Sequence, residues 1–316
     1  MLLTLFFIFS ITTVSSFDTD LSYNNINTSA SKDIDILGFF DDLMHKDFNS
    51  LISNGTEPDR KYGYWVWSGD MHSVNFDELS NNGVNVIFLN SYAFTEYGQR
   101  EVLEWIKDAN NHGIEVHIWM QIFYTGDWTP PVINGNPNTQ YFNQKIDEAR
   151  YYAGLEGVSG LQMDYIRFDG DAYRFQNGTY AINEFVKNFT HAVKEVNPSL
   201  TVSATVMPET DNDIYYYGQD IPTMGKYVDV IIPMMYKGNY EENSSWIHNT
   251  TQWFVENSGD AEVWVGLQTY QSDDNVTNTP ASELIKDGQL CFGGGAEGVV
   301  YFKWGMNEEL DHRKLN

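Results

Sequence analysis

The chain has 316 residues, of which 42% are hydrophobic and 15% aromatic, so it is long and apolar enough to bury one large core. Its formal net charge is −26, from 44 acidic and 18 basic residues. Such a surface repels phosphate groups, and we expect neither nucleic acid nor an anionic membrane as a partner. Cys291 is the sole cysteine, which excludes an internal disulfide.

The first residues, "MLLTLFFIFSITTVSS", form an apolar run that ends in small residues. The run is too short for a comfortable membrane span, and Val14 and Ser16 suit the −3 and −1 positions of a cleavage site. No Lys or Arg precedes it. We predict a signal peptide over residues 1–16 and a secreted or cell-surface protein without a membrane span after signal removal.

N-x-[ST] triplets agree with export as a glycoprotein, although a chain rich in Asn also produces such triplets by chance. They begin at Asn27, Asn54, Asn177, Asn188, Asn243, Asn249 and Asn275.

Residues 17–58 are polar and rich in Asn, Asp and Ser, which predicts a surface lead-in rather than a domain. After them, short β-branched or aromatic runs alternate with helical stretches such as 100–113 and 182–198. This alternation indicates βαβ units, and eight of them predict a single (β/α)₈ TIM-barrel domain over residues 59–316. A doubly wound sheet is the alternative, but no G-x-G-x-x-G turn follows the first run. The expected strands are 62–67, 84–90, 114–123, 159–168, 201–209, 228–236, 262–270 and 298–304.

The fourth expected strand carries a carboxylate among apolar residues, in "GLQMDYIRFDG". Alternation directs Leu161 and Met163 toward the helices and Asp164 into the barrel, near the strand end where barrel enzymes build their sites. A buried carboxylate is costly unless it is paired with a cation, solvated by water or part of a functional site. Arg167 is expected to lie beside Asp164 and hold it ionised, either in an active site or in a structural ion pair that closes the barrel.

The fifth expected strand supplies a second carboxylate, because the alternation of side chains directs Glu209, at its end, into the barrel. Asp164 and Glu209 would then meet at the barrel rim. Paired carboxylates are what glycoside hydrolysis requires, with Asp164 as nucleophile or base and Glu209 as general acid. Asp211 and Asp213 compete for the second role.

The same alternation assigns faces on three strands. The side chains expected to face the helices are Val202, Ala204 and Val206, then Val263, Val265 and Leu267, then Val116, Ile118 and Met120. Those expected to face the barrel interior are Thr201, Ser203, Thr205 and Met207, then Trp264, Gly266, Gln268 and Tyr270, then Glu115, His117, Trp119 and Gln121.

Aromatic and amide side chains recur at the expected strand ends, where they would stack on sugar rings and bind hydroxyl groups. Each one alone is as well explained by barrel packing. The candidates for substrate binding are Trp67, Asn90, Trp119, Gln121, Arg167, Tyr236, Gln268, Tyr270 and Trp304. The loop 124–140, with Trp128, is expected either to wall one side of a cleft or to be an idle surface loop.

No cofactor or metal is expected. His112 and His117 lie in "HGIEVH", which lacks the helical spacing of a zinc-binding pair, although a metal-dependent deacetylase would use them. The stretch 291–295, "CFGGG", follows a helical pattern and has no following Lys, which predicts a helix stop rather than a phosphate loop.

The segment 161–168, "LQMDYIRF", resembles the D-Y-[IV]-R-[FY] signature of secreted, glycoside-hydrolase-like TIM barrels. The segment 218–236 is similar to the fifth helix and sixth strand of those barrels, and its M-x-Y ending also resembles the distantly related chitinase-like barrels. The resemblance implies that Asp164 is a catalytic carboxylate and Tyr236 an active-site tyrosine. It extends over roughly residues 60–305.

Two departures limit what the resemblance implies. Ile166 occupies the place of the glutamate that chitinase-like barrels carry, and Asp169 and Gly170 stand where the first group would have a proline. We therefore predict a glycoside hydrolase acting on a polysaccharide or cell-wall glycan, without assigning the sugar. A carbohydrate-binding barrel without catalysis and a polysaccharide deacetylase are the alternatives.

Overall fold

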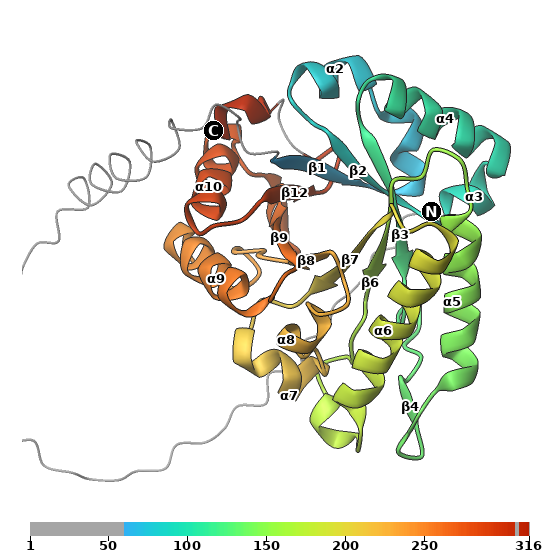
Figure 1. The fold of residues 1–316 in the computed structure, drawn as a ribbon. Coiled ribbons are helices and arrows are strands. Elements are labelled where there is room, and N and C mark those ends of the chain that lie inside the picture. Colours follow the sequence, from blue (N-terminus) through green and yellow to red (C-terminus); the bar gives the residue numbers. More distant parts are fainter. Residues whose placement is uncertain (1–59, 307–309, 316) are drawn as a thin grey trace, which may run out of the picture. The chain divides into compact units, whose positions relative to one another are not determined.

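A computed structural model describes residues 60–306 and 310–315. The expected signal peptide, the polar lead-in and the triplets at Asn27 and Asn54 lie outside the described residues. These residues form one barrel (Figure 1).

Eight parallel strands close into a barrel in the order β1-β12-β9-β8-β7-β6-β3-β2, with helices around it (Figure 1). The predicted TIM barrel is therefore confirmed. The barrel strands are β1 (Lys61–Val66), β2 (Val86–Asn90), β3 (Glu115–Gln121), β6 (Gly160–Asp164), β7 (Thr201–Val206), β8 (Val230–Pro233), β9 (Glu262–Gln268) and β12 (Gly298–Phe302).

Two short antiparallel hairpins, which the sequence patterns did not reveal, lie in loops at the carboxyl ends of β3 and β9. They are β4 (Val132–Ile133) with β5 (Asn136–Pro137), and β10 (Tyr270–Ser272) with β11 (Asn275–Asn278).

The helices carry apolar residues at helical spacing on the side that covers the barrel. In α4, Val102, Ile106 and Ala109 are buried, and Gly113 follows with a positive φ of 75° that stops the helix. The α helices are α2 (Phe76–Asn81), α3 (Ala93–Glu96), α4 (Gln99–Asn111), α5 (Thr139–Ala153), α6 (Gly178–Val196), α7 (Asp213–Tyr217), α8 (Ile221–Met224), α9 (Ser244–Asn257) and α10 (Ala281–Gly293). The 3₁₀ helices are η2 (Ser68–Ser73), η3 (Ala172–Arg174), η4 (Thr210–Asn212) and η5 (His312–Leu315).

Two apolar clusters occupy the two sides of the barrel wall. The outer cluster, between strands and helices, contains every side chain predicted to face the helices, Leu161 and Met163 included. The inner cluster fills the barrel with Trp65, Phe88, Trp119, Trp264 and their neighbours. The predicted outward faces of β3, β6, β7 and β9 are therefore confirmed, and Trp119 and Trp264 lie inside the barrel as predicted. Asp164 also points into the barrel, where Trp119 donates to it, whereas Met207 and Tyr270 lie beyond the ends of β7 and β9.

The strands that matter for the site end earlier than their sequence patterns suggested. β6 ends at Asp164, because Tyr165 adopts a left-handed φ of 51°. β7 ends at Val206, and Pro208 lacks the N–H group that would continue a ladder. Glu209 is thus a loop residue, and its expected position as the last inward residue of a strand is wrong.

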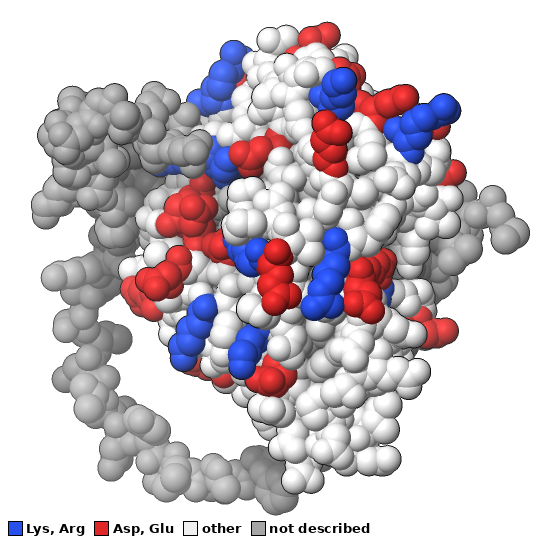
Figure 2. Space-filling view, turned by 45° about the vertical axis from the view of Figure 1, so that its right-hand side comes forward, with Lys and Arg blue, Asp and Glu red and all other residues white. Residues whose placement is uncertain are grey.

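Charged side chains are interspersed on the face that Figure 2 shows, acidic beside basic, and the lower part of that face carries none. The Asn residues of the N-x-[ST] triplets from Asn177 onward are all exposed. Within the described part of the chain, the helices are too short or too polar to cross a membrane.

Candidate active site

Asp164 lies at the carboxyl end of β6, with 7% of its surface exposed. Its Oδ1 accepts hydrogen bonds from the Thr205 hydroxyl (2.6 Å) and the backbone N–H of Tyr165 (2.8 Å). Its Oδ2 accepts one from the indole N–H of Trp119 (2.8 Å). Donors from the adjacent strands β3 and β7 and from its own backbone therefore fix the carboxyl group in one orientation.

Burial dominates the electrostatics of Asp164. Desolvation raises the pKa of its carboxyl group, and this effect outweighs the three hydrogen bonds and the more distant Arg167, all of which lower that pKa. A raised pKa favours a carboxyl group that keeps a proton to higher pH than an exposed aspartate does.

The residue after Asp164 has a strained backbone. Tyr165 has a φ of 51°, a conformation that residues with a side chain rarely adopt. It directs the Tyr165 N–H at Oδ1 of Asp164. Strain of this kind persists only where the surroundings impose it, and it clusters at functional sites.

Arg167 does not pair with Asp164. None of the ion pairs within residues 60–306 and 310–315 joins them, and the guanidinium instead donates to the carbonyl of Phe168 (3.1 Å). The expectation that Arg167 holds Asp164 ionised is therefore wrong, because the arginine lies among aromatic rings. Its Cζ is 4.9 Å from the ring centroid of Trp128, 5.3 Å from Tyr165 and 5.5 Å from Tyr217.

The loop 124–140 thus contributes to the site through Trp128. Tyr124 packs against both Trp128 and Tyr165, with centroid distances of 5.2 and 5.0 Å. This arrangement favours the interpretation of the loop as a wall over that of an idle surface segment.

Glu209 precedes η4 and is held by two tyrosines. Its Oε1 accepts hydrogen bonds from the hydroxyl groups of Tyr217 in α7 (2.8 Å) and Tyr240 after β8 (3.0 Å). Its backbone N–H donates to Oδ1 of Asp213 (3.2 Å). No sequence pattern pointed to these tyrosines, because both lie beyond the strands.

The other two acidic residues of this loop differ sharply. Asp211 is exposed, whereas Asp213 is fully buried. Burial first, and then the neighbouring Glu209 carboxylate, raise the pKa of Asp213 to about 9.

Adjacent strands and a shared arginine connect Asp164 and Glu209. β6 and β7 pair in parallel, and Thr205 of β7 reaches Asp164. The guanidinium of Arg167 contacts both Tyr165, next to Asp164, and Tyr217, whose hydroxyl binds Glu209. Both carboxyl groups therefore lie at the carboxyl-terminal end of the barrel, on either side of one aromatic cluster.

Among the predicted substrate-binding residues, those of the first three strands line the barrel interior near Asp164. Trp67 packs on Trp119 with a centroid distance of 4.6 Å. Asn90 and Gln121 end β2 and β3 and are buried. The Oδ1 of Asn90 accepts from the N–H of Tyr92, which leaves its buried Nδ2 without a partner among the described residues.

The predicted substrate-binding residues at the ends of the last strands lie on the side of the site opposite to those of the first three strands. Tyr236 stacks on Phe302 (5.7 Å between centroids), and its pKa is raised well above the usual value by burial and then by groups that include Asp164. Gln268 and Tyr270 both donate to Oδ1 of Asp273, at 3.1 and 3.0 Å.

Trp304 lies apart from these side chains. Its ring packs edge-on against Tyr64 of the outer cluster, and its indole N–H donates to Ser73. The aromatic residue of β12 that lies beside the site is Phe302, which packs against Trp119 and Tyr236. The sequence patterns did not single it out. The chain leaves β12 after Phe302, so the alternation no longer applies at Trp304.

Exposed tyrosines extend outward from Glu209 on η3 and α7. Tyr173 and Tyr215 stack face to face, with centroids 4.8 Å apart and planes inclined by 6°. They are 48% and 53% exposed. A ring pair of this kind is a platform on which a flat apolar ligand face can stack.

The two histidines considered for a metal lie in different surroundings. His112 ends α4, beside Asp77 and Asp108. His117 is buried inside the barrel against Phe88 and Trp264, and burial lowers its pKa. Among the described residues, no three His, Cys, Asp or Glu side chains converge on a place for a metal ion.

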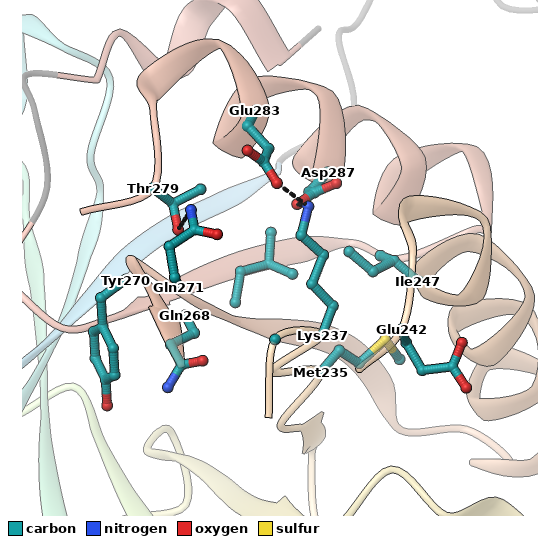
Figure 3. A pocket seen from close by; sticks show the side chains of 12 residues that line it. Met235, Lys237, Glu242, Ile247, Gln268, Tyr270, Gln271, Thr279, Glu283 and Asp287 are labelled. Atoms are coloured by element: carbon teal, nitrogen blue, oxygen red, sulfur yellow. Dashed lines mark hydrogen bonds and ion pairs between the residues drawn. The ribbon is translucent and has the colours of Figure 1, made fainter. Parts of the chain in front are cut away.

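A cavity lies between the segment after β8, the end of β9 and the helices α9 and α10 (Figure 3). In it, Lys237 points to α10 and forms ion pairs with Glu283 (2.6 Å) and Asp287 (2.5 Å). Lys237 therefore occupies both carboxylates of α10, while two of the predicted substrate-binding residues, Gln268 and Tyr270, line the same cavity.

Residues 127–256 match the model of a family described as "Putative glycosyl hydrolase domain". The matched segment is less than half of the chain, yet it includes Asp164, Glu209 and Asp213. The chain is also 23% identical over 232 residues to beta-galactosidase GalA of Bacillus licheniformis. That match covers 65% of this chain and only 29% of the length of the galactosidase.

Solved structures of glycoside hydrolases have the same fold. The glycoside hydrolase domain of PgaB (BpsB) from Bordetella bronchiseptica is similar with a TM-score of 0.61 and 11% identity, over 78% of this chain and 95% of that domain. A class V chitinase from Pseudomonas fluorescens Pf-5 has a TM-score of 0.61 and 13% identity, over 81% of this chain and 98% of the chitinase. These similarities show the TIM-barrel fold.

Proposed function

We propose that the protein is a glycoside hydrolase that cleaves a glycosidic bond of a polysaccharide or cell-wall glycan between the carboxyl groups of Asp164 and Glu209. The observation that carries this proposal is the buried, triply hydrogen-bonded Asp164 at the carboxyl end of β6, with Glu209 on the neighbouring loop. Two carboxyl groups supply the acid and the nucleophile or base that the reaction requires.

The surrounding side chains suit a sugar. Trp67, Trp119, Tyr236 and Phe302 present aromatic rings around the interior end of the barrel. Buried polar atoms there have no partner among the described residues, and sugar hydroxyl groups would supply one. These atoms are Asn90 Nδ2, Gln268 Oε1 and Arg167 Nε.

Two sequence features support a proposal about where the protein acts. We propose a secreted or cell-surface enzyme, because an apolar run ending in small residues starts the chain and N-x-[ST] triplets occur along it. The exposed Asn residues from Asn177 onward are compatible with glycosylation.

A panel of purified polysaccharides tests the proposal, with new reducing ends as the measure of cleavage. We expect at least one glycan to be cleaved, with no change on adding a chelator. Binding without cleavage would select the non-catalytic carbohydrate-binding barrel, and release of acetate that the chelator abolishes would select the deacetylase.

A further inference from the structure

The side chains of Glu209 and the buried Asp213 are neighbours, and two anions side by side would repel each other. The backbone N–H of Glu209 donates to Oδ1 of Asp213 (3.2 Å). Glu209 Oε2 and Asp213 Oδ2 are also buried oxygen atoms without a donor among the described residues. An ionised carboxylate only accepts hydrogen bonds. One proton on one of the two groups would satisfy both oxygen atoms at once.

The remaining atoms of the pair decide which group holds that proton. Oε1 of Glu209 already accepts two hydroxyl donors, from Tyr217 and Tyr240, and such bonds stabilise an anion. Oδ1 of Asp213 accepts the backbone N–H of Glu209, which leaves Oδ2 to carry a proton toward Glu209. Asp213 is also completely buried, and burial disfavours its charged form.

The charged and titratable groups that surround the pair do not supply a competing cation at Asp213. They are Tyr217 from α7, Tyr240 from the segment after β8, and Arg167 from the segment after β6. Arg167 contacts the ring of Tyr217 and forms no ion pair with either carboxyl group among the described residues. Two neighbouring anions without a countercharge in a buried place are strongly disfavoured.

We propose that Asp213 carries the single proton of this pair and thereby holds Glu209 as an anion, so that Glu209 is the nucleophile or base and Asp164 is the proton donor. This inference rests on the proposed hydrolysis and reverses the roles expected from the sequence. The hydrogen bonds to Asp164 favour its anion, but desolvation in its buried place outweighs them, which agrees with a proton donor there. Asp213 acts through Glu209 and is a positioning residue.

The reaction balances with these roles. The bond between the anomeric carbon and the glycosidic oxygen breaks, and its electron pair stays on that oxygen, which takes the proton of Asp164. Water supplies the hydroxyl group of the new reducing end. With Glu209 as nucleophile, its bond to the anomeric carbon forms and is then broken by that water, whose remaining proton returns to Asp164. With Glu209 as base, Glu209 takes the water proton and releases it to solvent, from which Asp164 regains its own. The proton of Asp213 stays in place throughout.

Infrared spectroscopy of the full chain at pH 7 tests the inference without a substrate. We expect the wild type to show a band of a buried protonated carboxyl group that Asp213→Asn lacks. The same band should persist in Asp164→Asn, which separates it from any band of Asp164 itself. It should also persist in the control Asp211→Asn, whose exposed carboxylate lies two residues away. Identical carboxyl bands in the wild type and Asp213→Asn would overturn the proposal.

Turnover of a responsive glycan gives the second measurement. The side-chain amide introduced by Asp213→Asn would still donate to Glu209, whereas Asp213→Ala removes the donor. The kcat should therefore be about tenfold or more lower in the Ala variant than in the Asn variant, with KM little changed. Equal loss in both variants would contradict a positioning role. If the band behaves as expected but no glycan is cleaved, the shared proton stands and the proposed hydrolysis fails.

Discussion

Asp213 combines complete burial with a neighbouring carboxylate, and both make its ionisation unfavourable in the folded state. Its pKa is raised from the ordinary 3.8 to about 9 on folding, so the folded chain binds this proton more tightly than the unfolded chain does. The contribution to stability is present at low pH and is lost as the pH rises from about 4 to about 9.

The free energy of unfolding of the wild type should therefore fall as the pH rises through this range, and that of Asp213→Asn should fall less steeply. Denaturant titrations at several pH values measure both slopes. Asp211→Asn, an exposed neighbour, should keep the slope of the wild type. A wild-type slope in Asp213→Asn would show that Asp213 ionises as freely in the folded chain as in the unfolded chain.

At the scale of elements, η3 and α7 place the stacked rings of Tyr173 and Tyr215 next to the loop of Glu209. If this platform binds the far end of a glycan, Tyr215→Ala should raise KM for a long glycan by about three- to tenfold, the equivalent of about 1 kcal/mol of stacking. The kcat for a short fragment that does not reach the platform should stay unchanged.

Tyr151→Ala is the matched control, because Tyr151 lies on α5 and is 48% exposed, like Tyr173. Steady-state kinetics with glycans of graded length separate the effects. Equal KM values for Tyr215→Ala and Tyr151→Ala on the long glycan would remove the platform from the binding site.

The start of β6 depends on a close approach that only glycine allows. A Cβ at Gly160 would lie 2.6 Å from the carbonyl oxygen of Thr201 and 2.7 Å from the ring of His117. Gly160→Ala should therefore lower the free energy of unfolding by about 1–3 kcal/mol, as overpacked sites do. Chemical denaturation measures the change, and Gly69→Ala, with open space around its Cβ, should have little effect. An unchanged stability of Gly160→Ala would contradict the tight packing of β6 on β7.

Alternation within strands was enough to predict the barrel, its eight strands and the inward direction of Asp164, because burial repeats every second residue there. The prediction fails where the chain leaves a strand. Glu209 follows Pro208 into a turn, and Trp304 follows the end of β12. Strand alternation therefore does not predict the direction of either side chain. The partners of Glu209 come from α7 and from the segment after β8, and such long-range contacts have no signature in a single sequence.

At the scale of the whole molecule, the closed barrel brings the loops of β6 and β7 to the same end and surrounds them with aromatic residues. The similarity to solved glycoside hydrolases extends over most of the barrel, and the family match covers the segment with both carboxyl groups. The barrel therefore places both carboxyl groups at one end, where the proposed hydrolysis would take place.

The most direct test of this account is turnover of a responsive glycan by Asp164→Asn and Glu209→Gln, measured as new reducing ends together with the affinity for the same glycan. We expect each variant to lose at least about 10²-fold in kcat, the usual contribution of one acid or base, and to retain binding. Asp169→Asn, an exposed carboxylate five residues beyond Asp164, should keep wild-type turnover. Wild-type turnover by either Asp164→Asn or Glu209→Gln would contradict the account.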